Sequence, residues 1–157
     1  MSGASHTFSF ASILAAPPEK VWARVSTLSG VNAEMAPWFR MTGPQGVDHL
    51  EPGQLALGQR LFRSWLLLFG VLPLDYDDLT FVRFEPGKGF LERSRMISAK
   101  VWEHERTLEP HPEGTLLTDR IRFEPRLPLP GLRGLYSSVF RHRHAQLRRH
   151  FGGRLAS

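Results

Sequence analysis

An aspartate stands on the expected apolar face of a strand-like segment in the second half of the chain. In Gly114 to Glu124, the side chains of Leu117, Asp119, Ile121 and Phe123 share one side of the pleat because strand side chains alternate with period two. Burying a carboxylate without a partner costs several kcal/mol. We therefore expect Asp119 to be paired with another polar group or to face a cavity.

Two earlier segments, Gly89 to Ile97 and Lys100 to Glu109, carry further ionisable residues on the corresponding face. If a hairpin turns through residues 98–100, side chains of the two segments become direct neighbours across the sheet. The predicted neighbours are Met96 and Trp102, Ser94 and His104, and Glu92 and Arg106.

A second hairpin, with its turn over residues 110–113, brings the third segment alongside. A slip of one residue in either hairpin would instead turn Glu103 and Glu105 inward. The predicted neighbours are His104 and Asp119, Arg106 and Leu117, and Trp102 and Ile121.

These polar side chains allow two kinds of chemistry. His104 with Asp119 would form an oriented pair of imidazole and carboxylate, and Glu92 with Arg106 an ion pair. The four groups could anchor the polar end of an apolar ligand, or His104 and Asp119 could act as general acid and base on a carbonyl compound. The structural alternative is that the four residues neutralise one another and hold the strands in register.

Ser94, His104 and Asp119 together imitate the triad of a serine hydrolase. The sequence has no Gly-x-Ser-x-Gly elbow, and the amides around a serine within a strand are used by the sheet, which leaves no identifiable oxyanion hole. We therefore assign no triad.

Metal-binding patterns are also missing from the sequence. His142 and His144 point to opposite sides of a predicted helix, and no HExxH spacing occurs. Asp75, Asp77 and Asp78 precede a strand and lack the glycine and the terminal glutamate of an EF-hand loop. We expect neither a metal nor a cofactor.

Periodicity predicts the elements that position these residues. A strand over Thr7 to Leu14 is followed by a helix that begins at Pro17 and Pro18, and Ser29 or Asn32 is expected to cap a second short helix. The pattern then becomes strand-like, and it returns to a helix over Leu132 to Phe151, which Gly152 and Gly153 close. The predicted strands after the helices cover residues 39–42, 59–69, 76–84, 89–97, 100–109 and 114–124, with a long loop at Gly43 to Gly58.

The composition is that of one globular domain over residues 1–157. Of these residues 41% are hydrophobic, and a chain of this length buries roughly two-thirds of its unfolded surface. The sequence has no cysteine, which excludes disulfides and thiolate metal sites. The longest apolar run, Trp65 to Leu74, is about half a membrane span, and no basic stretch precedes the apolar residues of the N-terminal segment. We expect a cytoplasmic protein.

The formal net charge of +5 is concentrated in the last segment. The simplest interpretation is a solvated basic helix face, with contact to a membrane surface or another polyanion as the alternative. We expect no nucleic acid partner, because the sequence contains no zinc-finger, RNP or KH pattern. The basic residues are Arg133, Arg141, His142, Arg143, His144, Arg148, Arg149, His150 and Arg154.

This order of elements is similar to the helix-grip fold of the START, birch-pollen-allergen and polyketide-cyclase superfamily, often called SRPBCC. The residues that carry the resemblance are FSFASILAAPPEKVWARVSTLSG, GFLERSRMISAKVWEHERTLEPHPEGTLLTDRIRFEP and FRHRHAQLRRHF. The resemblance implies an α+β fold with a curved antiparallel sheet of six to seven strands and two short helices after the first strand. It also implies a long C-terminal helix packed across the sheet, with a cavity between them.

Members of this superfamily range from carriers and sensors to cyclases and dehydratases, so the fold does not fix the function. We expect a protein that binds a small hydrophobic or amphipathic ligand, such as a lipid, in the cavity. One alternative is an enzyme that resembles the polyketide cyclases and uses His104 and Asp119 to move protons. Another is a protein-interaction module with a filled interior and an exposed apolar patch. The predicted ligand-binding residues are Trp38, Phe90, Glu92, Ser94, Trp102, His104, Arg106, Asp119, Ile121 and Phe123.

Overall fold

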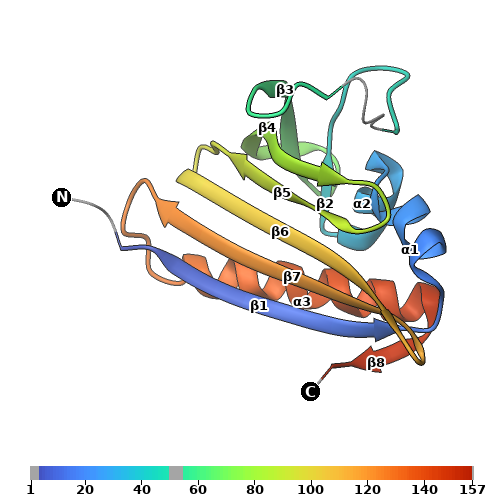
Figure 1. Ribbon diagram of the computed structural model, residues 1–157. Helices are drawn as coiled ribbons and strands as arrows, with labels where there is room; N and C mark the ends of the chain where they lie inside the picture. The colour runs from blue at the N-terminus through green and yellow to red at the C-terminus, as the bar shows by residue number, and fades with distance from the viewer. Residues whose placement is uncertain (1–3, 50–54, 157) are drawn as a thin grey trace.

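The computed structural model describes residues 4–49 and 55–156 (Figure 1), which form three helices and one eight-stranded sheet. Of the predicted loop over 43–58, residues 50–54 lie outside this part, and the flanking residues 43–49 and 55–58 form no helix or named strand. The elements are β1 (His6–Leu14), α1 (Pro18–Val25), α2 (Leu28–Met35), β2 (Phe39–Met41), β3 (Arg60–Leu68), β4 (Leu72–Glu85), β5 (Gly89–Ser94), β6 (Ala99–His111), β7 (Gly114–Pro125), α3 (Leu132–Phe151) and β8 (Gly153–Leu155).

The strands pair antiparallel in the order β2-β3-β4-β5-β6-β7-β1-β8. Figure 1 shows α3 running along one face of the sheet beside β7 and β1, with α1 and α2 at one end. The α+β architecture, the two short helices after the first strand and the long C-terminal helix are as predicted.

The eighth strand, β8, was not predicted, because three residues are too few for alternation to be recognised. Gly152 and Gly153, with φ of 79° and 121°, turn the chain out of α3, and β8 then pairs with β1. A Cβ atom on Gly153 would lie 1.9 Å from the carbonyl oxygen of Ile13. The close approach of β8 to β1 therefore requires glycine at this position.

Thr27 is the N-cap residue of α2. The hydroxyl oxygen of Thr27 accepts a hydrogen bond from the Gly30 amide at 2.9 Å, which satisfies one of the free amides of the first turn. The predicted caps, Ser29 and Asn32, both lie inside the helix. The Asn32 side chain instead bonds the backbone of Met41 as donor and as acceptor, and this ties α2 to β2.

The central hairpins have the predicted faces but different registers. Glu92 lies opposite His104 rather than Arg106, and His104 lies opposite Ile121 rather than Asp119. The pairing is displaced by two residues, and alternation with period two keeps each side chain on its predicted face. In the second hairpin the strands pair as far as residues 111 and 114, so a tighter turn replaces the predicted one. The same displacement makes the other predicted cross-strand neighbours wrong. These are Met96 and Trp102, Ser94 and His104, Arg106 and Leu117, and Trp102 and Ile121.

Buried apolar side chains form two clusters, one toward each end of α3. Strands β6 and β7 pass through both clusters and carry buried polar residues between them. The first cluster is built on Met96, Ala99, Trp102, Ile121, Phe123, Tyr136 and Phe140, and the second on Leu14, Val21, Val25, Leu108, Leu117 and Leu147.

Candidate functional site

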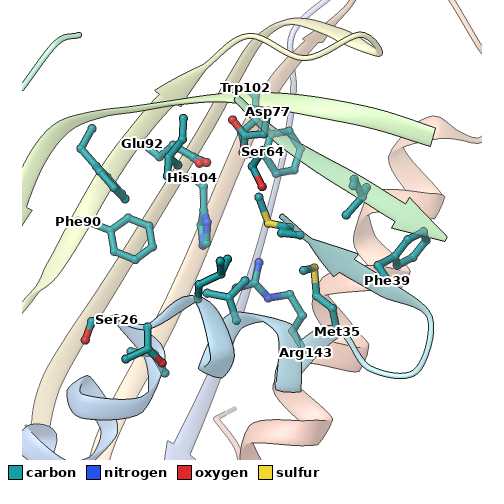
Figure 2. Close-up of a pocket in the computed structure, with 18 of the residues that line it drawn as sticks. Ser26, Met35, Phe39, Ser64, Asp77, Phe90, Glu92, Trp102, His104 and Arg143 are labelled. Atoms are coloured by element: carbon teal, nitrogen blue, oxygen red, sulfur yellow. The ribbon is translucent and has the colours of Figure 1, made fainter. Parts of the chain in front are cut away.

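A pocket of about 170 Å³ opens between the sheet, α2 and α3 (Figure 2). This is far more room than the roughly 10–15 Å³ that one water molecule needs. Its walls are mainly apolar, and the buried ionisable side chains that also face it are Asp77, Glu92, His104, Tyr136 and Arg143. The apolar wall includes Leu28, Val31, Met35, Phe39, Phe62, Leu79, Phe81, Phe90 and Phe140.

Buried polar side chains between the two apolar clusters form what we call the polar layer. Asp119 lies in this layer and is fully buried. Its Oδ1 accepts hydrogen bonds from His104 Nε2 and Arg106 Nε, both at 2.7 Å, and its Oδ2 accepts from Arg106 Nη2 at 2.7 Å and His144 Nε2 at 2.9 Å. These four bonds use the acceptor capacity of the carboxylate. The polar layer comprises Ser12, Glu34, His104, Arg106, Asp119, Arg143 and His144.

Arg106 joins two carboxylates that come from different elements. Besides Asp119 on β7, it binds Glu34 on α2, with its Nη1 and Nη2 donating to the two carboxylate oxygens at 3.0 and 2.9 Å. Arg143 on α3 donates from Nε to the same Glu34 at 3.1 Å. Two arginines therefore face two carboxylates, and the charges of the polar layer balance.

Ser12 extends the polar layer to β1. Its hydroxyl lies 2.8 Å from His144 Nδ1 and accepts a hydrogen bond from Arg148 Nη1 at 3.0 Å. His144 thus bridges β1 and β7 through its two ring nitrogens.

Burial and charge partners act on the protonation states in the polar layer. Burial lowers the pKa of His104 to about 4, although Asp119 opposes this, so the imidazole is neutral near pH 7 and donates Nε2–H to Asp119. Burial alone would raise the pKa of Asp119, but Arg106 and His104 hold it well below its usual range. The pKa of Glu34 is lowered because Arg106 and Arg143 outweigh burial.

A pair of carboxyl groups lies outside the polar layer, on β4 and β5. Asp77 and Glu92 are each 5% exposed and face the pocket (Figure 2). Burial raises the pKa of Asp77 to about 7, although Ser94 and Glu92 act to lower it. Burial and the neighbouring Asp77 raise the pKa of Glu92 well above its usual range, so Glu92 keeps its proton at neutral pH.

A family model described as Domain of unknown function (DUF8410) matches residues 12–151. The chain belongs to this family. The matched segment of the DUF8410 chain begins within β1 and ends with α3, so it contains the pocket lining and the polar layer. No curated protein matches the chain.

Solved structures share the fold of the DUF8410 chain. Protein CV1439 from Chromobacterium violaceum is 18% identical with a TM-score of 0.69, over 93% of this chain and 97% of that one. The structure of Ara h 8.0201 gives 12% identity and a TM-score of 0.62, over 94% and 98% of the two chains. DynU16, a protein in the dynemicin biosynthetic locus, gives 14% identity and a TM-score of 0.53, over 96% of this chain but 47% of its own. These likenesses confirm the predicted helix-grip fold and say nothing about function.

No helix in residues 4–49 and 55–156 has the length and apolar character needed to cross a bilayer. Over the same ranges, no three His, Asp or Glu side chains are grouped so that they could hold a metal ion. His142, one of the two histidines considered above, lies with Nε2 2.7 Å from the carbonyl oxygen of Ala36.

The predicted site residues of the DUF8410 chain are divided between the pocket and the regions around it. Trp38 is 49% exposed and lies beside Phe69, with ring centroids 6.0 Å apart, rather than in the pocket wall. Phe90, Glu92, Trp102 and His104 line the pocket; Arg106 and Asp119 lie in the polar layer; and Ser94, Ile121 and Phe123 are buried outside the lining.

One predicted ion pair is wrong. Arg106 binds Glu34 and Asp119, whereas Glu92 is the neighbour of Asp77. The two-residue displacement of the hairpin is the cause, because it places His104 rather than Arg106 opposite Glu92. His104 and Asp119 nevertheless contact each other, since diagonal neighbours on one face of a sheet are within reach of long side chains.

The sequence analysis missed the pocket-facing Asp77, although a signal was present. Asp77, Leu79 and Phe81 alternate along β4 and share a face, as Asp119 and its apolar neighbours do on β7.

The predicted solvated basic face of α3 is wrong for Arg143 and His144, which are 7% and 0% exposed.

Helical spacing could have predicted the burial of Arg143 and His144, because they lie between Phe140 and Leu147 on the buried stripe of α3. Glu34 has no comparable signal. It is fully enclosed by partners that come from β6 and α3, far away in the sequence.

Proposed function

We propose that this protein binds a small hydrophobic or amphipathic molecule in the pocket between the sheet and α3, as a carrier or a sensor. The observation that carries the proposal is the pocket itself, about 170 Å³ bounded mainly by apolar side chains. Apolar volume left without contacts is costly to a fold, and a ligand that fills it gains by removing its own apolar surface from water. The resemblance to the carriers and sensors of the helix-grip superfamily supports the same proposal.

The chemistry of His104 and Asp119 favours binding over catalysis. A general base works best when its pKa lies near the operating pH. Burial lowers the pKa of His104 to about 4, and Asp119 already accepts four hydrogen bonds. A cyclase-like enzyme that uses this pair therefore has less support. An interaction module would be expected to have a filled interior, which the pocket argues against.

Titration with the uncharged fluorescent dye prodan tests the proposal. We expect saturable binding by the wild-type protein and an affinity at least about tenfold lower, about 1.4 kcal/mol, in Leu79→Trp. Leu79 lines the pocket, so a larger side chain there removes room for the dye. The matched control is Val82→Trp on the same strand, because Val82 is 41% exposed and does not line the pocket.

Both variants are first checked by circular dichroism and thermal unfolding. The control should bind the dye as the wild type does. If the wild type does not bind the dye, or if Leu79→Trp binds it as tightly as Val82→Trp does, the proposed function is wrong.

A further inference from the structure

Two carboxyl groups in one apolar pocket need an explanation. Asp77 lies on β4 and Glu92 on β5, both are buried, and both face the same hollow (Figure 2). β4 and β5 are paired neighbours in the sheet, and both side chains lie on the face that lines the pocket. Carboxyl groups are rarely buried unless a partner compensates for the water that they lose.

One carboxyl oxygen of Asp77 lacks a hydrogen-bond partner. Among the residues that the structure describes, Asp77 Oδ1 is the buried side-chain polar atom without a hydrogen-bond partner. The polar layer has no such vacancy at Asp119, which receives four hydrogen bonds. An unsatisfied buried acceptor beside an unfilled pocket indicates a place for a donor that the protein itself does not supply.

Over residues 4–49 and 55–156, no salt bridge joins Asp77 or Glu92 to a basic side chain of the protein. The positive group that acts on the pKa of Glu92 is Arg143, whose Nε is bound to Glu34 at 3.1 Å. Arg106 is held by Glu34 and Asp119. Because both arginines already bind the carboxylates of the polar layer, a positive charge that bonds Asp77 or Glu92 directly is left to a ligand.

We propose that Asp77 and Glu92 bind the protonated amine of an otherwise apolar ligand, so that the pocket selects small amphipathic amines. This inference rests on the proposed function and names the ligand class of the same pocket. An ammonium group has three N–H donors and no acceptor, which suits two carboxyl groups with a free acceptor oxygen.

The aromatic wall beside the pair fits the same ligand class. Phe81 lies opposite Glu92 in the β4–β5 pairing, and its ring centroid is 5.3 Å from that of Phe90. Trp102 also lines the pocket, and its ring centroid lies 6.1 Å from that of Phe140. Aromatic faces attract ammonium groups, while a ligand carboxylate would meet two groups of its own charge type.

Proton exchange gives the proposal a pH signature. Ammonium binding favours the ionised carboxylates, so the affinity for an amine should rise with pH as the pair loses protons around and above the Asp77 pKa of about 7. The other groups that act on the pair are Asp75 and Asp78, which raise the pKa of Asp77, and Arg143, which lowers that of Glu92. His104 and Tyr136 also line the pocket, with pKa values of about 4 and about 12, so neither titrates in this range.

The test compares octylamine, octanol and octanoate, which share one chain and differ in the head group, by displacement of prodan. At about pH 8 we expect octylamine to bind at least about tenfold more tightly than octanol and octanoate, and this preference should shrink at about pH 5.5. Asp77→Asn and Glu92→Gln should each reduce the preference for octylamine over octanol, and circular dichroism and thermal unfolding check that both variants are folded. Glu85→Gln is the matched control, because Glu85 lies on the same strand as Asp77, is 52% exposed and does not line the pocket.

The outcomes separate this inference from the proposed function. If the three probes bind equally, or if octanoate binds most tightly through Arg143, the pocket is a binding site but the amine assignment is wrong. If no probe displaces the dye and the dye itself does not bind, both proposals fall.

Discussion

Buried carboxyl groups in this protein differ in protonation because their neighbours differ. Asp119 and Glu92 are both almost fully buried, and burial disfavours the charged form of each. Arg106 and His104 nevertheless keep the pKa of Asp119 low, whereas the carboxyl group of Asp77 adds to the rise at Glu92. The polar layer is therefore a set of satisfied ion pairs. Asp77 and Glu92 instead favour the protonated form, and the proposed ammonium ligand would displace their protons.

Replacing Asp77 should stabilise the free protein at neutral and alkaline pH. The pKa of Asp77 is about 7 in the folded protein and about 3.9 when unfolded, so the folded state holds the extra proton between these values. The stability from this group is fully present below about pH 3.9 and is lost as the pH rises through about 7. We expect Asp77→Asn to exceed the wild type by up to about 3 kcal/mol at pH 8 in urea unfolding, with the gap closing toward pH 4.

Asp78→Asn serves as a control of opposite sign. Arg63 lowers the pKa of Asp78, so the stability from Asp78 is present above its unfolded pKa and is lost as the pH falls through the folded value. This variant should be less stable than the wild type at neutral pH and approach it in acid. If both variants change in the same direction with pH, Asp77 does not carry the burial penalty that we assign to it.

The elements are held together by the same polar layer. Helix α2 is short, and one of its buried residues is an acid that binds Arg106 of β6 and Arg143 of α3. A carboxylate is suited to this position because it accepts from several donors at once. Glu34 thus connects three elements that are far apart in the sequence.

Glu34→Gln should weaken this connection without changing the shape of the side chain. Removing one partner of a buried ion pair leaves uncompensated charge, and we expect a loss of about 3–5 kcal/mol in the free energy of unfolding, measured in urea. Glu113→Gln is the control, since Glu113 and its partner Arg154 are both more than half exposed and should contribute little. A loss at position 34 no larger than that at position 113 would contradict the proposed role of α2.

Alternation in the sequence predicts which face of a strand a residue occupies, and it does so for Asp119, His104 and Arg106. Turn lengths set the register of the hairpins. The register differs by two residues from the predicted one, so the residue opposite Glu92 in the sheet is His104 and not Arg106. Contacts between distant segments, such as that of Glu34 with Arg106, have no local pattern at all. The fold and the inward face could therefore be predicted, but the pairing of Asp77 with Glu92 could not.

At the scale of the whole molecule, the pocket shares walls with the parts that stabilise the fold, since His104 and Arg143 of the polar layer and Phe140 of the first apolar cluster also line it. The two apolar clusters and the polar layer close the sheet against α3, and the pocket lies beside them under α2 and the β2–β4 edge. Figure 1 shows this edge lying away from β1 and β8, which cover the end of α3. A ligand in the pocket would therefore add contacts between α2, α3 and the β2–β4 edge.

A ligand that binds only the folded protein must raise its unfolding temperature by mass action. At a concentration about 100 times its dissociation constant it stabilises by about 2.7 kcal/mol, and a domain of this size gains roughly 2–4 °C per kcal/mol. We therefore expect saturating octanol to raise the midpoint of thermal unfolding by roughly 5–11 °C in the wild type and in Val82→Trp. Leu79→Trp should show little or no rise, because its pocket is already occupied by the indole. An equal rise in all three proteins would mean that octanol acts elsewhere on the surface, and no rise in any of them would mean that the pocket does not receive it.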